Sequence, residues 1–597
     1  MNGLNKVSIP TATPTSSHLD LSCDHVTTMN FGEMQPIHYR HDIKGERLDL
    51  NAAGTVRPFP LAAPTYGRMR LNVHHFYVPW RIVFPQYESF YNDTIAVNAD
   101  NSSLIADAPY FLNSSIVQIF VSNMLGLGMF ATVISNWHSG DPFDFCDTAG
   151  VHYRFTTFGK YIYKILTSLG YAINWDDKDN TPYSALPILA YCKIFIDYYA
   201  NQSYLDSQDV IEIKKLLAYN DPVTPLEIPA LKFAYIFGLI SKVMYDQDYF
   251  VGAWDNPFAP NGQQYSAISF SDIVSGAYVS NTSQGSMTIT NGTPAMVAAE
   301  SGTNSGLSLG TQYLHDALKA ITDYSKRHQL AGASNIYRTI AQWGFGVNHM
   351  KFDRALHLGG KSIDIKTGAV FSTANTAQGN DPSTLGDFAG NGFGNGVSGF
   401  NYKPDEMGIE ISIASILPSG GYFQGMDENN MHIHRLQFFT PEFDGLATQI
   451  IRKRELYVSN DGNFGRDDNQ DLLYDSAFGF TGRYAEYKRP RSWVSGDLRC
   501  PTRFSGSNAW HLMREFSDAS FNYRINNVVH NLSFTRYFDS DTYKRIFTNT
   551  DTDNDPFVVE FHFSVGAYAP CRGLFETYDF GKGGDKVQLE SNGSILN

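Results

Sequence analysis

The sequence predicts a mainly β protein, an eight-stranded antiparallel β-sandwich of the jelly-roll type with long loop and helical insertions. Short runs of alternating apolar residues, separated by Gly and Pro, occur near both ends of the chain, and aromatic residues make up 14% of it. Strands at the two ends would have to pair with one another. A jelly roll suits them because its first and last strands meet in one sandwich.

The first part of the chain contains an arm and a set of strands. Residues 1–17 are polar and rich in Pro, Ser and Thr, which predicts a flexible N-terminal arm. Residues 18–80 are predicted to be the N-terminal strands of the jelly roll, at 25–31, 34–43, 47–52 and 68–79. The alternation is cleanest in the last run, where every second residue from Met69 to Val73 is apolar.

The middle of the chain is predicted to consist of insertions. Residues 81–260 are mixed helical and loop segments, and the apolar runs at 155–171 and 230–246 are too long for ordinary strands and contain no Pro, so they predict buried helices. Residues 261–310 are rich in Ser, Thr, Gly and Asn and nearly free of Lys and Arg after 275, which predicts an exposed insertion.

Residues 311–400 are predicted to be a further helix and loop insertion. A helical stripe occupies 311–330, and a Gly/Asn-rich loop covers about 372–400. Residues 401–597 are predicted to return to jelly-roll strands and connecting loops, with strands at 409–417, 431–439, 479–488 and 557–565.

Charge and cysteine content exclude several classes of protein. The formal net charge is -15, whereas a free-standing nucleic-acid binder is usually basic, although a shell with local basic patches inside is compatible with it. The five cysteines are far apart and odd in number, so neither a disulfide framework nor a zinc site is predicted. The N-terminus has no signal-peptide pattern, and no apolar run of 18 residues predicts membrane insertion.

The partial matches to cofactor-binding motifs each lack a required residue or structural context, and no catalytic motif is found. No catalytic residue and no cofactor is therefore predicted. The segment LHLGGKS at 356–362 has Ala355 where a P-loop requires Gly. A formal G-x-G-x-x-G formed by Gly394, Gly396 and Gly399 is assigned to the Gly/Asn-rich loop, without the strand and helix that nucleotide binding needs.

One acidic segment is a weak candidate for a metal site. Asp551, Asp553 and Asp555 alternate as calcium ligands can, but Pro556 follows where an EF-hand has Gly. A solvated turn is therefore favoured over a calcium site.

Two basic clusters are the candidate contact residues. Arg452, Lys453 and Arg454 form one cluster. The second comprises Lys488, Arg489 and Arg491, with aromatic neighbours at Tyr484, Tyr487 and Trp493. Cations bind phosphates and aromatic faces stack on single-stranded bases, so a nucleic-acid contact is one interpretation. A salt-bridged rim at a subunit interface is the other, and it is slightly favoured.

Several segments together resemble the major capsid protein of microviruses, the small circular single-stranded DNA bacteriophages, and in particular their gokushovirus-like branch. The resemblance is strongest in GRYAEYK, S-x-V-S-G and WHL, which follow one another within 478–516. Further similar segments lie at 29–64, 74–90 and 314–360. The segment QLAGASNIY at 329–337 departs from the family, which usually has an arginine- and glycine-rich turn there.

The resemblance implies a viral jelly roll and a structural role rather than an enzymatic one. It implies a T=1 icosahedral shell of many copies around circular single-stranded DNA, assembled in the host cytoplasm. The implied partners are a small basic DNA-packaging protein, a scaffolding protein and a host cell-surface receptor. It also implies that one insertion forms a protrusion at the three-fold axes, for which 261–310 is the candidate.

Two alternatives belong to other functional classes. A jelly-roll enzyme that hydrolyses glycans would require an identifiable acid pair, and the carboxylates here are too numerous to single one out. A glycan-binding module or phage spike would usually be a smaller β domain or show repeats. Microscopy of the purified protein separates the three, because it shows shells, monomers or elongated trimers.

Overall fold

The computed structural model describes a little under three fifths of the chain. The described residues are 17–91, 108–121, 130–133, 150–176, 178–200, 228–240, 242–254, 353–371, 388–444, 448–458, 477–489, 492–499, 507–516, 537–550 and 554–571, with short strands and a few helical residues elsewhere. Residue contacts divide the chain into a main unit, residues 1–258 and 355–597, and a second unit, Ala259–Arg354.

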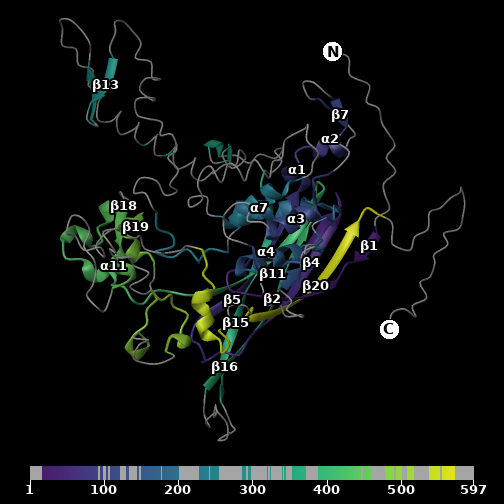
Figure 1. Ribbon diagram of the computed structural model, residues 1–597. Coiled ribbons are helices and arrows are strands. Elements are labelled where there is room, and N and C mark those ends of the chain that lie inside the picture. The colour runs from purple at the N-terminus through teal and green to yellow at the C-terminus, as the bar shows by residue number, and fades with distance from the viewer. Residues whose placement is uncertain are drawn as a thin grey trace, which may run out of the picture. The chain divides into compact units, whose positions relative to one another are not determined.

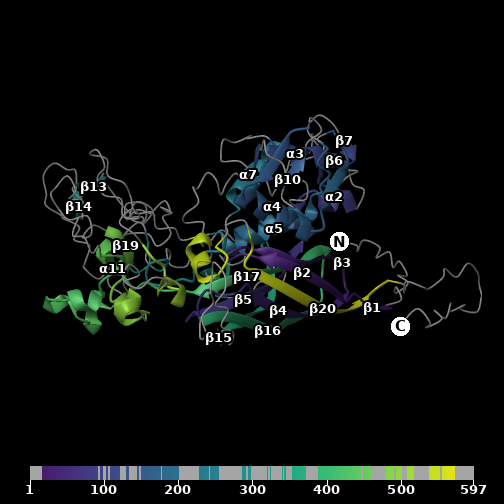
Figure 2. The same ribbon diagram turned by 60° about the horizontal axis from the view of Figure 1, so that its bottom comes forward.

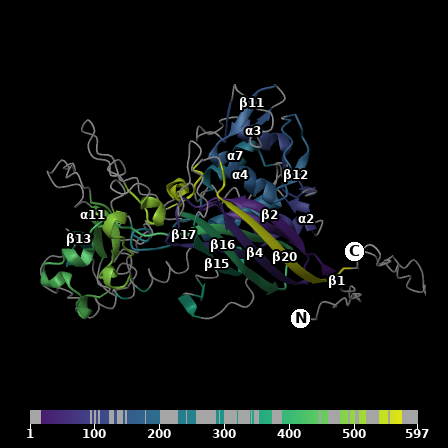
Figure 3. The same cartoon turned by 90° about the horizontal axis from the view of Figure 1, so that it is seen from below.

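The main unit contains a nine-stranded antiparallel sheet (Figures 1 and 3). Its strands come from three separate stretches of the chain, near the start, past the middle and near the end. They are β1 (Ser17–Asp20), β2 (Cys23–Met29), β3 (Gln35–Asp42), β4 (Arg47–Pro58), β5 (Arg68–Pro79), β15 (Leu356–Phe371), β16 (Phe388–Tyr402), β17 (Gly408–Ser419) and β20 (Phe557–Ala569).

The pairing of these strands agrees with the predicted jelly roll. Eight of them form two layers in the orders β2-β20-β4-β16 and β3-β17-β5-β15. The β15–β16 pair joins the layers, and β1 adds to β20. Strands from the first 80 residues thus alternate with later strands within each layer, which is consistent with a double-sheet jelly roll. The prediction of a mainly β fold is confirmed.

Alternating apolar residues form the core between the layers. Leu48 and Leu50 of β4 and Leu71 of β5 are fully buried. The inward residues of β20 are buried as well, at Phe557, Val559, Phe561, Phe563 and Val565. Full burial of such a side chain contributes about 1.5–3 kcal/mol, so the period-two pattern specifies which face of each strand is inside.

The Gly/Asn-rich segment expected as a loop at 372–400 is a sheet strand from Phe388 onward. Strand β16 pairs with both β15 and β4. Two of its inward positions have no room for a side chain, because a Cβ on Gly394 would lie 2.8 Å from Val56 and one on Gly396 would lie 2.8 Å from Ile363. The formal G-x-G-x-x-G is therefore a close-packing pattern within a strand. Part of the insertion expected at 311–400 thus belongs to the sheet.

A helical insertion covers the outer side of the β17 layer (Figure 2). Ile409, Ile411 and Ile413 of β17 are fully buried against it. Its helices are α1 (Trp80–Val83), α2 (Tyr87–Tyr91), α3 (Asn113–Val121), α4 (Thr157–Ser168), α5 (Leu186–Ile194), a π-helical turn η1 (Phe195–Tyr199) and α7 (Ala230–Leu239). Its short strands are β6 (Ile95–Val97), β7 (Ser102–Leu104), β8 (Tyr110–Leu112), β9 (Ala131–Val133), β10 (Asp144–Cys146), β11 (His152–Phe155) and β12 (Pro182–Ser184).

Both helices expected in this insertion are present. Helix α4 lies within the predicted 155–171, and the Thr156 hydroxyl caps it by accepting a hydrogen bond from the Gly159 N–H at 3.1 Å. Helix α7 begins at the predicted residue but ends at Leu239, earlier than expected, because Ile240 takes an extended conformation.

The second unit contains a hairpin of β13 (Ser286–Thr290) and β14 (Thr293–Val297). These strands fall inside the insertion predicted at 261–310. Most of that insertion, all of the predicted arm at 1–17 except Ser17, and most of the stripe at 311–330 lie outside the described residues.

A module between β17 and β20 is built mainly from turns. It contains β18 (Thr448–Arg452), β19 (Ala477–Gly482), α11 (Lys453–Leu456) and 3-10 helices, namely η2 (Glu428–Met431), η3 (Arg435–Gln437), η4 (Pro441–Phe443), η6 (Ala485–Tyr487), η7 (Gly496–Arg499), η8 (Ser507–Trp510) and η9 (Asp541–Ile546). The strand predicted at 431–439 is wrong, since this segment consists of 3-10 turns and extended links.

The tight packing of β16 leads to a stability prediction. Substituting Gly394→Val should destabilise the chain by about 1–3 kcal/mol, because the new side chain must displace Val56 and approach the Asp364 carbonyl. Gly368→Val on the neighbouring strand is the control, since a Cβ there has open space. Urea unfolding of the purified chains measures both, and equal midpoints for the two variants would contradict the packing argument.

Candidate functional site

The basic and aromatic residues predicted as contact residues lie in the module between β17 and β20. Strands β18 and β19 pair in an antiparallel hairpin, and Phe480 of β19 also bridges to Trp254. A small core of its own, which includes Phe250, Tyr422 and Leu456, lies beneath the hairpin. The module therefore holds the candidate residues on a packed support.

The chain turns sharply after β19, which ends before the predicted boundary at residue 488. Tyr484 has a φ of 62°, the left-handed region that a non-glycine residue enters at a cost of about 1–3 kcal/mol. Its N–H donates to Gln449 Oε1 at 2.7 Å, and its ring is buried against Phe439 at a centroid distance of 5.2 Å. Tyr484 therefore acts as a structural anchor, whereas Tyr487 is half-exposed.

The cations of the second cluster have partners within the chain. Lys488 forms an ion pair with Asp444, and the Arg489 guanidinium donates to the backbone carbonyl of Asp248. Arg491 lies outside the described residues. These contacts attach the segment to the loop at Asp444 within the module and to the segment around Asp248 outside it.

The first cluster surrounds the start of α11. The Arg452 N–H donates to Glu455 Oε1 at 2.6 Å, which caps the helix. Burial lowers the pKa of Lys453, and the Arg454 carbonyl accepts a hydrogen bond from the Met426 N–H at 2.9 Å. All three side chains are half-buried.

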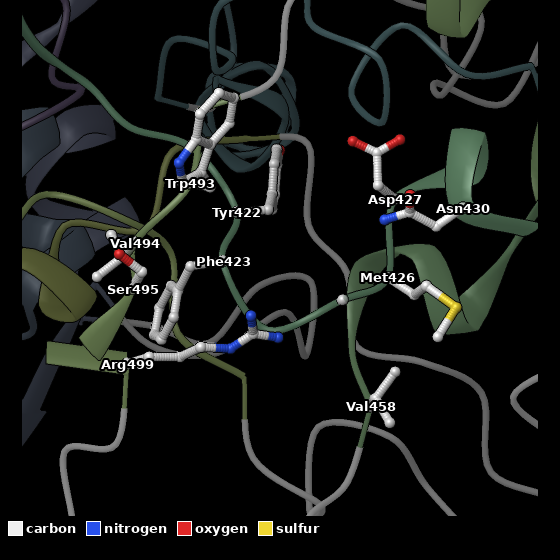
Figure 4. Close-up of a pocket in the computed structure, with 11 residues that line it drawn as sticks. Tyr422, Phe423, Met426, Asp427, Asn430, Val458, Trp493, Val494, Ser495 and Arg499 are labelled. Carbon is white, nitrogen blue, oxygen red and sulfur yellow. The ribbon is translucent and has the colours of Figure 1, made fainter. Parts of the chain in front are cut away.

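Trp493 borders two adjacent cavities and is 76% exposed. The larger cavity has a volume of about 440 Å³ (Figure 4). Figure 4 shows the Trp493 and Tyr422 rings at one side, Asp427 and Asn430 at another, and the Arg499 guanidinium directed toward the middle. The described lining includes no histidine or cysteine. The aromatic face, the Arg499 cation and the Asn430 amide suit the binding of a planar group that carries negative charge near Arg499, at the side away from the Asp427 carboxylate.

The smaller cavity, of about 240 Å³, contains buried carboxylates that sequence reasoning missed. Glu428 and Glu455 share a hydrogen bond, and burial raises the pKa of both. His432 Nε2 lies 3.7 Å from Glu486 Oε1 and 3.9 Å from Glu428 Oε1. Glu428 and His432 lie four residues apart, but Glu455 and Glu486 come from other turns, so no spacing in the sequence signals the group. Like-charge crowding favours a shared proton between Glu428 and Glu455.

The acidic segment proposed as a metal site is only partly described. Asp551 and Asp553 lie outside the described residues. Asp555 accepts a hydrogen bond from the Thr28 hydroxyl at 2.7 Å and contacts Lys164 Nζ at 3.0 Å. Its carboxylate thus links the start of the sandwich to α4. Within the described part of the chain, no group of three or more His, Cys, Asp or Glu is placed to hold a metal ion.

Comparison with known proteins identifies similar sequences. The model of the capsid protein (F protein) family matches residues 7–118 and 240–572, which include all nine strands of the large sheet. Capsid protein VP1 of Chlamydia phage 1 is 21% identical over 566 residues, covering 85% of this chain and 88% of the relative. Capsid protein VP1 of Bdellovibrio phage phiMH2K is 22% identical over 538 residues, covering 85% and 87%. In the described part of the chain, no helix is long and apolar enough to cross a membrane.

The buried carboxylates lead to a prediction about pH. Burial first, and Glu428 second, raise the pKa of Glu455 from 4.5 to about 8. Between these values the folded chain holds a proton that the unfolded chain has released, so stability decreases as the pH rises from about 4.5 to 8. Glu455→Gln stays uncharged and should remove this decrease, which amounts to at most roughly 1.4 kcal/mol per pH unit.

Urea unfolding between about pH 6 and pH 9 measures this difference. Glu442→Gln, an exposed acid of the same module, is the control and should follow the wild-type curve. Parallel curves for wild type and Glu455→Gln would contradict the proposed protonation of the pair.

Proposed function

This chain belongs to the capsid protein (F protein) family, and we propose that its copies assemble into a T=1 icosahedral shell around a circular single-stranded DNA genome. It is a structural capsid protein, and its location is the virion. The sandwich supports the proposal because β20 is held on both sides within its layer, which gives a rigid block from which long insertions extend toward neighbours.

The charge of the chain suggests that a different protein neutralises the DNA in the particle. A subunit with a net charge of -15 supplies little neutralisation for DNA phosphates overall. A small basic DNA-packaging protein would supply that charge, and a scaffolding protein would guide assembly in the host cytoplasm. Local cations then contact the genome only where they line an inward-facing cavity.

The cavity beside Trp493 is the genome contact that we favour. The exposed indole can stack on one base, and Arg499 on the same cavity can pair with a phosphate. Lys488 and Arg489 serve a different role, since their partners Asp444 and Asp248 hold the loop in place. Tyr487 remains a second candidate for stacking because it is half-exposed.

The insertion at 261–310 is the proposed outer surface that contacts the host receptor, as a protrusion at the three-fold axes. Its small polar residues bury little apolar area, so removing 275–306 should leave assembly intact while attachment to host cells decreases. Counting particles by microscopy and bound particles by plaque adsorption separates the two effects. Loss of soluble protein upon deletion would assign the segment to a core or an interface instead.

Expression of the full chain with its packaging partner tests the function as a whole. Negative-stain microscopy should show closed shells, and nuclease treatment should leave protected single-stranded DNA. A purified chain that stays monomeric at every concentration, or one that forms elongated trimers, would overturn the proposal.

The stacking role of Trp493 has its own test. Trp493→Ala should leave folding and shell yield unchanged, because the side chain is 76% exposed, but should lower the DNA protected per shell. Each lost stacked base corresponds to roughly 1–3 kcal/mol. Tyr91→Ala is the matched control, since Tyr91 is also largely exposed but lies on α2, in the helical insertion. Equal DNA content in both variants would exclude the stacking contact.

A further inference from the structure

Four large apolar side chains follow one another at the surface of the module between β17 and β20. We call Ile433, Leu436, Phe438 and Phe439 the apolar strip; they are 82%, 58%, 48% and 45% exposed. They belong to the segment whose alternation predicts a strand at 431–439. A strand would bury one face of this segment within the chain, but the structure leaves these side chains at the surface.

The strip is held in a defined conformation. Gln437 Oε1 accepts hydrogen bonds from the N–H groups of Ile433 and His434, each at 2.7 Å. Arg483 donates to the Leu436 carbonyl at 3.1 Å and lies over the Phe443 ring at 5.1 Å. The backbone is thus fixed by polar contacts of its own, while the apolar side chains remain about half-exposed or more.

Aromatic packing beneath the strip fixes its far end. The Phe439 ring lies 5.2 Å from that of Tyr484 and 5.8 Å from that of Tyr487, and the Phe438 ring lies 5.6 Å from that of His432. The left-handed backbone of Tyr484 is held by its contacts with Gln449 and Phe439, so this support has a defined conformation. A preformed apolar surface loses little conformational entropy when a partner covers it, which favours binding.

We propose that the apolar strip is a contact surface for a second copy of this chain. The inference rests on the proposed function, because a shell subunit must bury part of its own surface against other copies. Exposed apolar patches of this kind mark protein interfaces, and aromatic side chains are enriched in interface cores.

The charge around the strip favours a copy of this chain over a basic partner. Two copies with a net charge of -15 repel each other except where a surface lacks negative charge. Segment 431–443 contains one acid, Glu442, against Arg435 and two histidines. Arg435 is exposed beside the strip, so its guanidinium would attract an acidic neighbour and repel a small basic protein.

The double variant Ile433→Ser, Leu436→Ser tests the inference in the full chain. Both side chains are largely exposed, so the melting temperature should not change. Sedimentation velocity should show that the subunit concentration at half assembly increases by at least about tenfold, which corresponds to about 1.4 kcal/mol. The control Val133→Ser, Leu231→Ser replaces equally exposed aliphatic residues at 67% and 53% and should assemble as wild type does.

The remaining outcomes overturn the inference. Normal assembly of the double variant does so, as does an equal defect in the control. A lower melting temperature would place the strip in the core of the chain itself, and normal shells with reduced packaging would assign it to another partner. Failure of the wild-type chain to assemble would instead overturn the proposed function, so the two failures are distinguishable.

Discussion

The position of β20 inside one layer of the sandwich is the constraint on which the rest of the structure depends. This strand lies near the end of the chain, yet it pairs with β2 on one side and β4 on the other. The hydrogen bond between Thr28 and Asp555, just before β20, joins residues 527 positions apart. The layer therefore closes only when the two ends of the chain meet, and every intervening insertion must leave both edges of β20 accessible.

A buried row of hydrogen-bonded polar side chains crosses the sandwich. Hydrogen bonds depend on direction, unlike the apolar contacts around them. His38 Nδ1 lies 2.6 Å from Glu410, the Ser412 hydroxyl donates to the same carboxylate at 2.6 Å, and His75 contacts Ser412 at 2.8 Å and Ser398 at 3.0 Å. Burial lowers the pKa of His75 to about 4. Burial also lowers the pKa of His38, but the charge of Glu410 and the hydrogen bonds with Cys23 and Glu410 together outweigh it, and the pKa rises to about 10. A charged pair next to a neutral imidazole gives each hydroxyl a defined partner, which favours one register of the strands.

The sandwich and the module between β17 and β20 differ in how they use apolar residues. In the sandwich, alternation reflects burial within the chain, as in β20. In segment 431–443, a similar alternation accompanies side chains that remain exposed, such as Ile433 and Leu436. The physical driving force is the same in both, namely removal of apolar area from water. The two differ only in whether the apolar residues are covered by the same chain or by a neighbouring one. A capsid protein requires both kinds of apolar surface.

The amino-acid sequence by itself determined the sandwich strands β2, β5, β17 and β20, because a buried face imposes its period on adjacent residues. It also determined the family, through the order of motifs such as GRYAEYK and WHL. That β16 is a strand could be seen only in the tertiary structure, because its inward glycines are required by the close approach of side chains from β4 and β15. The cavity was likewise decided by folding, because Tyr422, Trp493 and Arg499 come from separate turns. The sequence of a segment shows how regularly apolar and polar residues alternate. The surface that covers its apolar face is formed by residues far away in the chain or by another molecule, so the segment alone does not specify it.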